Sequence, residues 1–206
     1  MIRSPRPFLV DMDGTLVDST VAVENAWRGF CGLHGLDLAQ VLAFAHGRPT
    51  LATTSHFLDD VELAEREALR IQAGELEVRE GVGMVPGAAD FVAALGDDWA
   101  LVTSADRALA TRRMQLAGVP MPSTCVFSED ITRGKPDPQP YQLAAERLGV
   151  DIAECIVLED SPAGIRAGLA SGATTVVVGS LSDFDDRLLR LPDLTGTTPE
   201  QLSREV

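Results

Sequence analysis

Short apolar runs alternate with segments of helical periodicity along most of this chain. A short apolar run that ends in a turn is typical of a buried strand. Apolar residues three or four positions apart predict helices between the later strands, over residues 105–116, 139–148 and 162–171. The expected strands cover residues 7–10, 99–103, 125–128, 155–158 and 174–178. This alternation predicts an α/β fold with a doubly wound, Rossmann-like parallel sheet and a further core helix over residues 88–95.

The interval between the first two strands is too long for an ordinary crossover, which takes about 30 residues in a compact α/β unit. Helical patterns fill it, at approximately residues 19–32, 38–45, 49–58 and 61–77. We therefore expect a core of residues 1–17 and 84–206, with an inserted all-helical cap of residues 18–83. The glycine-rich segment 81–87 is expected to act as the hinge between them.

Polar side chains follow four of the expected strands. They are Asp11 and Asp13, Thr103 and Ser104, Lys135, and Glu159 and Asp160. Ligands of open parallel sheets bind outside the carboxyl ends of the strands, so we expect these side chains to converge there.

Asp11 and Asp13 leave the first strand on the same face, because residues i and i+2 of a strand point the same way. Two like charges about 4 Å apart repel by roughly 4 kcal/mol at an effective dielectric constant near 20. One carboxylate must therefore take a proton, or a cation must lie between them. The alternative is a polar turn without chemistry.

Four short motifs occur in an order that resembles the haloacid dehalogenase superfamily of phosphohydrolases. They are Asp-x-Asp-Gly-Thr at 11–15, Val-Thr-Ser at 102–104, Gly-Lys-Pro at 134–136 and Glu-Asp-Ser-Pro-Ala-Gly at 159–164. The likeness covers nearly the whole chain. It extends to the sugar and polyol phosphate phosphatases, which are related to β-phosphoglucomutase and phosphoglycolate phosphatase.

This resemblance implies a role for each acid. Asp11 would be the nucleophile that forms an aspartyl-phosphate, and Asp13 would protonate the leaving oxygen and later activate water. Mg²⁺ would bind the Asp11 carboxylate, the Asp13 backbone carbonyl and Asp160, with Glu159 as a ligand directly or through water.

The same resemblance implies a phosphate-binding set. The Thr103 hydroxyl and the backbone N–H groups of Ser104 and Ala105 would bind phosphoryl oxygens, although the hydroxyls could simply cap a helix. Lys135 would neutralise the remaining charge. It is the only lysine in the chain, although the sequence has 17 basic residues.

The segment His46-Gly47-Arg48-Pro49-Thr50 resembles the specificity loop of these phosphatases. Gly47 and Arg48 are expected to bind substrate, and either Arg48 or His46 to touch its phosphate or hydroxyls. The alternative for both is an ordinary surface loop residue. His34 and His56 lie outside every motif and are expected to be structural.

Departures from related families narrow the reaction. Phosphomutases of this superfamily carry a histidine where this chain has Val23. They also use a lysine in the cap, as phosphonate-cleaving members do, whereas residues 18–83 of this chain contain no lysine. The sequence therefore favours a Mg²⁺-dependent phosphatase of small phosphorylated sugars or polyols. Alternatives are a phosphoglycolate phosphatase, a β-phosphoglucomutase-type phosphotransferase and a non-enzymatic receiver-like switch, although receivers lack a cap.

Composition sets the remaining expectations. A net charge of −14 and a pI near 4.5 oppose binding to nucleic acid and to anionic membranes. Cys31, Cys125 and Cys155 form no metal or disulfide pattern, and the last two are expected to be buried. No apolar run approaches the length of a signal peptide or a membrane span. We expect a cytoplasmic monomer whose partner is a small phosphorylated metabolite.

Overall fold

A parallel sheet forms the centre of the computed structural model, which describes residues 6–181, 184 and 187–206. Within these residues the strand order is β5-β4-β1-β6-β7-β8, and every neighbouring pair is parallel. The strands are β1 (Phe8–Val10), β4 (Trp99–Val102), β5 (Thr124–Val126), β6 (Ile156–Glu159), β7 (Thr174–Val178) and β8 (Arg190–Leu191). The predicted doubly wound α/β fold is confirmed.

Helices cover both faces of the sheet, which explains why its central strands are apolar at every position. The helices are α5 (Ala88–Leu95), α6 (Arg107–Ala117), α7 (Gln139–Leu148), α8 (Pro162–Ser171) and α9 (Pro199–Glu205). Phe8 and Val10 of β1 pack with α5, α6 and α9, whereas Leu9 points to the opposite face and packs with α7 and α8.

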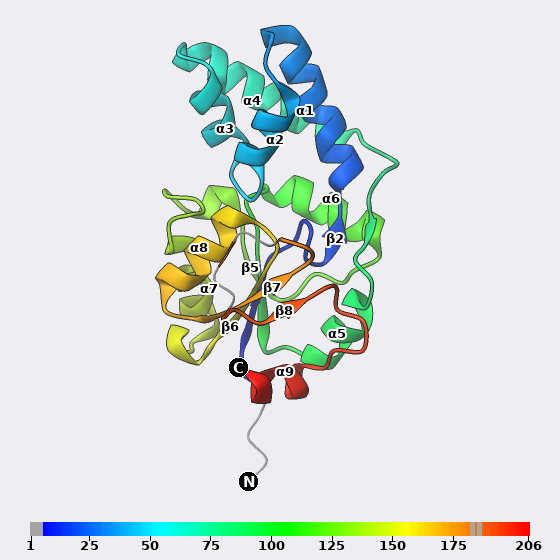
Figure 1. Cartoon of the computed structure of the whole chain (residues 1–206), viewed down its shortest axis with the longest axis vertical. Coiled ribbons are helices and arrows are strands. Elements are labelled where there is room, and N and C mark those ends of the chain that lie inside the picture. Colours follow the sequence, from blue (N-terminus) through cyan, green and yellow to red (C-terminus); the bar gives the residue numbers. More distant parts are fainter. Residues whose placement is uncertain (1–5, 182–183, 185–186) are drawn as a thin grey trace.

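Four further helices lie over the carboxyl edge of the sheet, opposite the end that carries α9 (Figure 1). These cap helices are α1 (Thr20–His34), α2 (Leu38–Ala45), α3 (Thr50–Phe57) and α4 (Val61–Leu76). They have a small apolar core of their own, built around Trp27, Phe30 and Ile71. The carboxylates of Asp37 and Asp60 cap α2 and α4 by accepting hydrogen bonds from backbone N–H groups in the first turn of each helix. The boundaries 1–17, 18–83 and 84–206 remain a proposal.

The two connections between core and cap form a short antiparallel ribbon, which the sequence did not predict. β2 (Val17–Asp18) pairs with β3 (Gly83–Met84), inside the segment expected to be a hinge. Strands of two residues carry no detectable alternation. Ser19 directly precedes α1, but its side chain makes no cap hydrogen bond and instead donates to Asp13.

The C-terminal segment also differs from expectation. β8 and α9 were both missed, although Thr198 and Gln201 form a capping box at the start of α9. The sequence also predicts a short amphipathic stretch over residues 184–191, which lies partly outside the described residues. Cys155 is buried as expected, but Cys125 is only partly buried, and both thiols are free.

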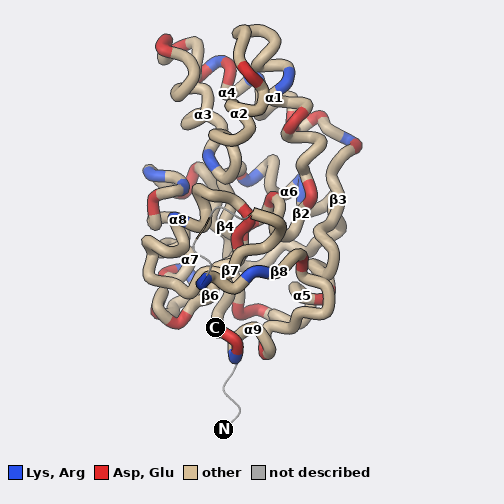
Figure 2. The backbone as a smooth tube through the Cα atoms, viewed as in Figure 1, with Lys and Arg blue, Asp and Glu red and all other residues tan. Residues whose placement is uncertain are grey.

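Acidic and basic positions are distributed over both the sheet unit and the cap helices (Figure 2). No helix in the described part of the chain combines the length and apolarity needed to cross a membrane.

Candidate active site

The carboxyl ends of four neighbouring strands bring the predicted residues together beneath the cap helices (Figure 1). Asp11 directly follows β1, and its backbone N–H donates to Leu158 O at 3.0 Å. Thr103 follows β4 and donates in the same way to Val126 O at 3.0 Å. The sheet ladder therefore extends into the site and fixes the backbone of both residues.

Lys135 lies at the centre of the site and is almost completely buried. Its Nζ donates to Asp11 Oδ1 at 2.5 Å, to Glu159 Oε1 at 2.7 Å and to Val102 O at 3.1 Å, so all three ammonium protons are used. Burial by itself would lower the pKa of Lys135, but the charges of Asp11 and Glu159 outweigh it and raise the pKa. The lysine is a permanent cation beside Asp11.

Glu159 is fully buried, and its carboxylate accepts five hydrogen bonds. Oε1 accepts from Lys135 and from the Tyr141 hydroxyl at 2.8 Å, while Oε2 accepts from Asp160 N–H and from the backbone and hydroxyl of Ser161. Burial favours the neutral acid, but Lys135 and these donors lower the pKa of Glu159. Because its acceptors are occupied, Glu159 is better placed to hold Lys135 than to ligate a metal directly. No sequence signal pointed to Tyr141.

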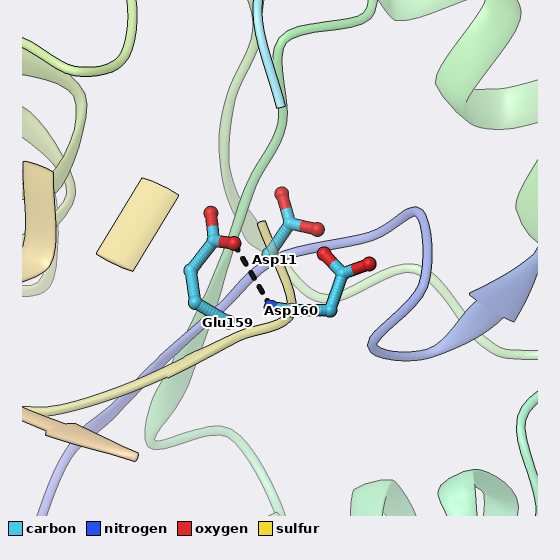
Figure 3. Close-up of side chains that lie close together, drawn as sticks. All are labelled: Asp11, Glu159 and Asp160. Carbon is cyan, nitrogen blue, oxygen red and sulfur yellow. Dashed lines mark hydrogen bonds between the residues drawn. The ribbon is translucent and has the colours of Figure 1, made fainter. Parts of the chain in front are cut away.

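Asp11, Glu159 and Asp160 contribute carboxylate oxygens that all lie within 4.8 Å of one another (Figure 3). Burial and the charge of Glu159 raise the pKa of Asp11 well above its ordinary value, although Lys135 opposes this. Burial likewise raises the pKa of Asp160. Oδ1 of Asp160 is buried without a hydrogen-bond partner among the described residues. Hard oxygen ligands and an orphaned carboxylate oxygen fit a Mg²⁺ ion, which would favour the ionised acids.

The Asp13 carboxylate is held apart from this group. Its Oδ1 accepts from the Ser19 hydroxyl at 2.6 Å, and its Oδ2 accepts from Arg113 Nη1 at 2.8 Å. Arg113 also donates to Glu75 Oε1 of α4 at 2.6 Å. Sequence reasoning missed Arg113, because one arginine on an amphipathic helix normally faces solvent.

The predicted phosphate-binding amides are only partly available. The buried Thr103 Oγ1 accepts from Ala105 N–H at 3.1 Å, so this amide already has a partner. Ser104 Oγ donates to Gly47 O at 2.9 Å and thereby links the core to the cap loop. α6 begins at Arg107, two residues later than expected, because the Asp106 side chain caps it by accepting from Leu109 N–H.

The loop of residues 46–49 in the cap brings the His46 side chain into contact with the acidic group, whereas the Arg48 side chain binds within the cap. His46 Nε2 lies 2.8 Å from Asp160 Oδ2. Arg48 lines the cavity described below, but its guanidinium donates to Phe44 O at 2.6 Å and lies 4.2 Å from the Phe44 ring centroid. His56 of α3 stacks against Phe44, with ring centroids 3.8 Å apart. The ring of His34 lies tilted against that of Phe30, with centroids 4.9 Å apart.

A cavity of about 350 Å³ lies between the carboxyl edge of the sheet and the cap helices. The core contributes Asp11, Asp13, Thr103 and Asp160, whereas Trp27 and Glu75 come from the cap. Its size is that of a small-molecule site. Every predicted site residue except Lys135 and Glu159, which lie beneath the floor, lines this cavity.

Gly164 lies in the first turn of α8, and its lack of a side chain leaves the space that the Glu159 carboxylate occupies. A Cβ at residue 164 would lie 1.6 Å from Glu159 Oε1. We expect Gly164→Ala to lower the free energy of unfolding by about 3 kcal/mol and to reduce activity, although alanine is the better helix former. Chemical denaturation measures the first effect.

Gly74→Ala is the matched control, because Gly74 is also helical and nothing lies within 4 Å of the added Cβ. This variant should be about 0.5–1 kcal/mol more stable than the wild type. If Gly164→Ala raised the free energy of unfolding as much as Gly74→Ala, an added Cβ at residue 164 would not clash with Glu159.

Comparison with known proteins gives consistent results. A model of the haloacid dehalogenase-like hydrolases matches residues 6–172. Hexitol phosphatase A of Escherichia coli (strain K12) is 41% identical over 181 residues, covering 85% of this chain and 84% of the relative. 2-Deoxyglucose-6-phosphate phosphatase 1 of Saccharomyces cerevisiae is 33% identical, covering 88% and 82%. The β-phosphoglucomutase structure from Clostridium difficile superimposes with a TM-score of 0.85 at 18% identity, covering 98% of this chain and 97% of that one.

Proposed function

We propose that this chain, which belongs to the haloacid dehalogenase-like hydrolases, is a Mg²⁺-dependent phosphatase of small phosphorylated sugars or polyols. The observation that carries the proposal is the position of Asp11, which contacts the buried cation of Lys135 beneath a cavity of small-molecule size. Asp13, two residues later, lines the same cavity. A nucleophile, a proton carrier and a fixed positive charge are the groups that phosphoester hydrolysis needs.

In the first step, an Asp11 carboxylate oxygen attacks phosphorus, and the bond from phosphorus to the ester oxygen breaks. The leaving alkoxide takes the bonding electron pair and receives a proton from the neutral acid form of Asp13, which becomes a carboxylate. In the second step, Asp13 accepts a proton from water, the water oxygen attacks phosphorus, and the bond to Asp11 breaks. Inorganic phosphate is released and both carboxyl groups return to their starting states.

The remaining residues stabilise charge and exclude water. Lys135 keeps a fixed positive charge beside Asp11, and the Thr103 hydroxyl lines the cavity, where charge develops on the phosphoryl oxygens. Asp11, Asp160 and the Asp13 backbone carbonyl would hold Mg²⁺, which supplies positive charge to the phosphoryl group and favours ionised Asp11. Glu159 holds Lys135 in place. The cap helices shield the aspartyl-phosphate from bulk water.

The cavity favours a neutral, hydroxyl-rich leaving group. Its lining has five acids, Asp11, Asp13, Glu24, Glu75 and Asp160, but only two arginines, Arg48 and Arg113. A carboxylate on the substrate, as in phosphoglycolate, would meet this excess of negative charge. The relatives named above for hexitols and 2-deoxyglucose 6-phosphate support the same class. Nothing favours a mutase, since the cap segment contains no lysine.

The test is phosphate release from a panel of hexitol, hexose, glycerol and small-acid phosphates, with Mg²⁺ and with a chelator. We expect turnover concentrated on a few sugar or polyol phosphates, and a loss of about 10²-fold or more without the metal. No turnover on any member, with a stable phospho-enzyme instead, would contradict the proposal. Cytoplasmic location and a monomeric state remain predictions.

Metal binding has a second readout that does not depend on turnover. Mg²⁺ at about 100 times its Kd should stabilise the folded state by about 2.7 kcal/mol, which corresponds to a rise in Tm of about 5–10 °C. Thermal unfolding with and without Mg²⁺ measures it. Asp160→Asn should abolish the rise, whereas Asp97→Asn, at an exposed position, should keep it. An undiminished rise in Asp160→Asn would place the ion elsewhere.

A further inference from the structure

Arg113 forms a buried bridge between the cap and Asp13. Its guanidinium donates to Asp13 Oδ2 through Nη1 and to Glu75 Oε1 through Nη2. The side chains of Arg113 and Glu75 are 7% and 6% exposed, whereas that of Asp13 is 29% exposed and faces the cavity. Arg113 belongs to α6 of the core and Glu75 to the last turn of α4 in the cap.

Because the Arg113 guanidinium is planar, its contact with the Glu75 carboxylate affects its contact with the Asp13 carboxylate. Its N–H groups form a rigid fork, so the ion pair with Glu75 fixes the plane in which Nη1 meets Asp13. Burial alone would lower the pKa of Arg113, but the charges of Asp13 and Glu75 raise it, so the group stays cationic. A buried arginine that lost Glu75 would be left with half of its charge compensation.

The second oxygen of Asp13 is also held from the cap side. Ser19, which donates to Asp13 Oδ1, directly precedes α1, and α1 packs on α4 in the cap. Both carboxylate oxygens of Asp13 are therefore held by groups that connect to the cap helices. Lifting α4 from α6 would separate Glu75 from Arg113 and release the guanidinium.

We infer that Arg113 is a positioning residue that orients the Asp13 carboxylate for proton transfer and, through Glu75, makes this orientation depend on contact between α4 and α6. The inference rests on the proposed function. The acid–base group is aligned when the cap rests on the core, so proton transfer to the leaving group is coupled to closure over the substrate.

Leaving-group dependence separates this role from a merely structural one. An alkyl phosphate releases a strongly basic alkoxide and needs a proton from Asp13, whereas p-nitrophenyl phosphate releases a weakly basic phenolate and needs little assistance. The ratio kcat/KM reports events up to the first irreversible step, cleavage of the ester bond. Dephosphorylation of Asp11, which is common to both substrates, does not enter it.

The experiment measures kcat/KM for a hexitol phosphate and for p-nitrophenyl phosphate in the wild type, Glu75→Gln, Arg113→Met and Arg113→Lys. Arg112→Met, the same change at the neighbouring, partly exposed residue of α6, is the matched control. General acid catalysis contributes about 10²–10⁴-fold, so Arg113→Met should lose about 10²-fold on the alkyl ester and less than about 5-fold on the aryl ester. Glu75→Gln should also lower kcat/KM more for the alkyl ester than for the aryl ester, with a loss roughly a third to a tenth of that in Arg113→Met. Arg113→Lys should lose less on the alkyl ester than Arg113→Met does.

Arg113→Met leaves Glu75 buried without a cation, so it can fail to fold. The double variant Arg113→Met/Glu75→Met removes both charges and keeps the test usable. Equal losses on the two esters, or none on either, in the variants that fold would overturn the inference while the wild type still hydrolysed both. A wild type inactive on every ester would instead overturn the proposed function, and the inference with it.

Discussion

Replacing Asp11 with asparagine should reduce phosphate release by about 10⁴–10⁶-fold, the range seen when a covalent nucleophile is removed. The amide nitrogen and oxygen cannot attack phosphorus to form the aspartyl-phosphate. The fold should persist, because the change is nearly isosteric and removes a buried carboxylate whose pKa is raised by burial and by Glu159. Phosphate release from a hexitol phosphate with excess Mg²⁺ measures the loss.

Thermal unfolding provides the check that Asp11→Asn is folded. We expect a Tm within about 4 °C of the wild type, equivalent to about 1 kcal/mol for a chain of this size. Asp97→Asn, an exposed change of the same chemistry, should retain full activity. Residual turnover of Asp11→Asn above about 1% would exclude the covalent mechanism.

Lys135→Met should lose about 10³-fold in kcat and also destabilise the protein by about 3–5 kcal/mol. Activity falls because the fixed positive charge beside Asp11 is removed. Stability falls because Glu159, which is completely buried, and Asp11 lose their common cation. Phosphate release and denaturant unfolding measure the two effects separately.

The double variant Lys135→Met/Glu159→Gln separates catalysis from folding. Replacing the Glu159 carboxylate with a neutral amide should restore part of the lost stability, because only Asp11 then remains without its cation. Activity should stay as low as in the single variant. If restoring stability also restored activity, the lysine would act through the fold alone.

The main elements of the fold could be predicted because burial leaves a pattern in the sequence. β1 and β6 are covered on both faces and therefore read as continuous apolar runs, and Ser161 with Pro162 marks the start of α8. The structure places Gly164 N–H on the Ser161 hydroxyl, as a cap at that position requires. β2, β3 and β8 have two residues each, which is too short for any periodicity.

The sequence by itself determined which chemical groups meet at the site, because the carboxyl ends of parallel strands share one edge. Asp11, Thr103 and Asp160 directly follow such strands, and Glu159 is the last residue of one. Only the tertiary structure decided how each group is held. Asp13 and Arg113 are 100 residues apart. Their pairing depends on α6 packing beside β2, and no local periodicity records contact between segments so far apart in the chain. Packing also decides the different roles of the two neighbouring acids. Glu159 accepts five hydrogen bonds and holds Lys135, whereas Asp160 keeps one oxygen without a partner among the described residues and is available to a metal.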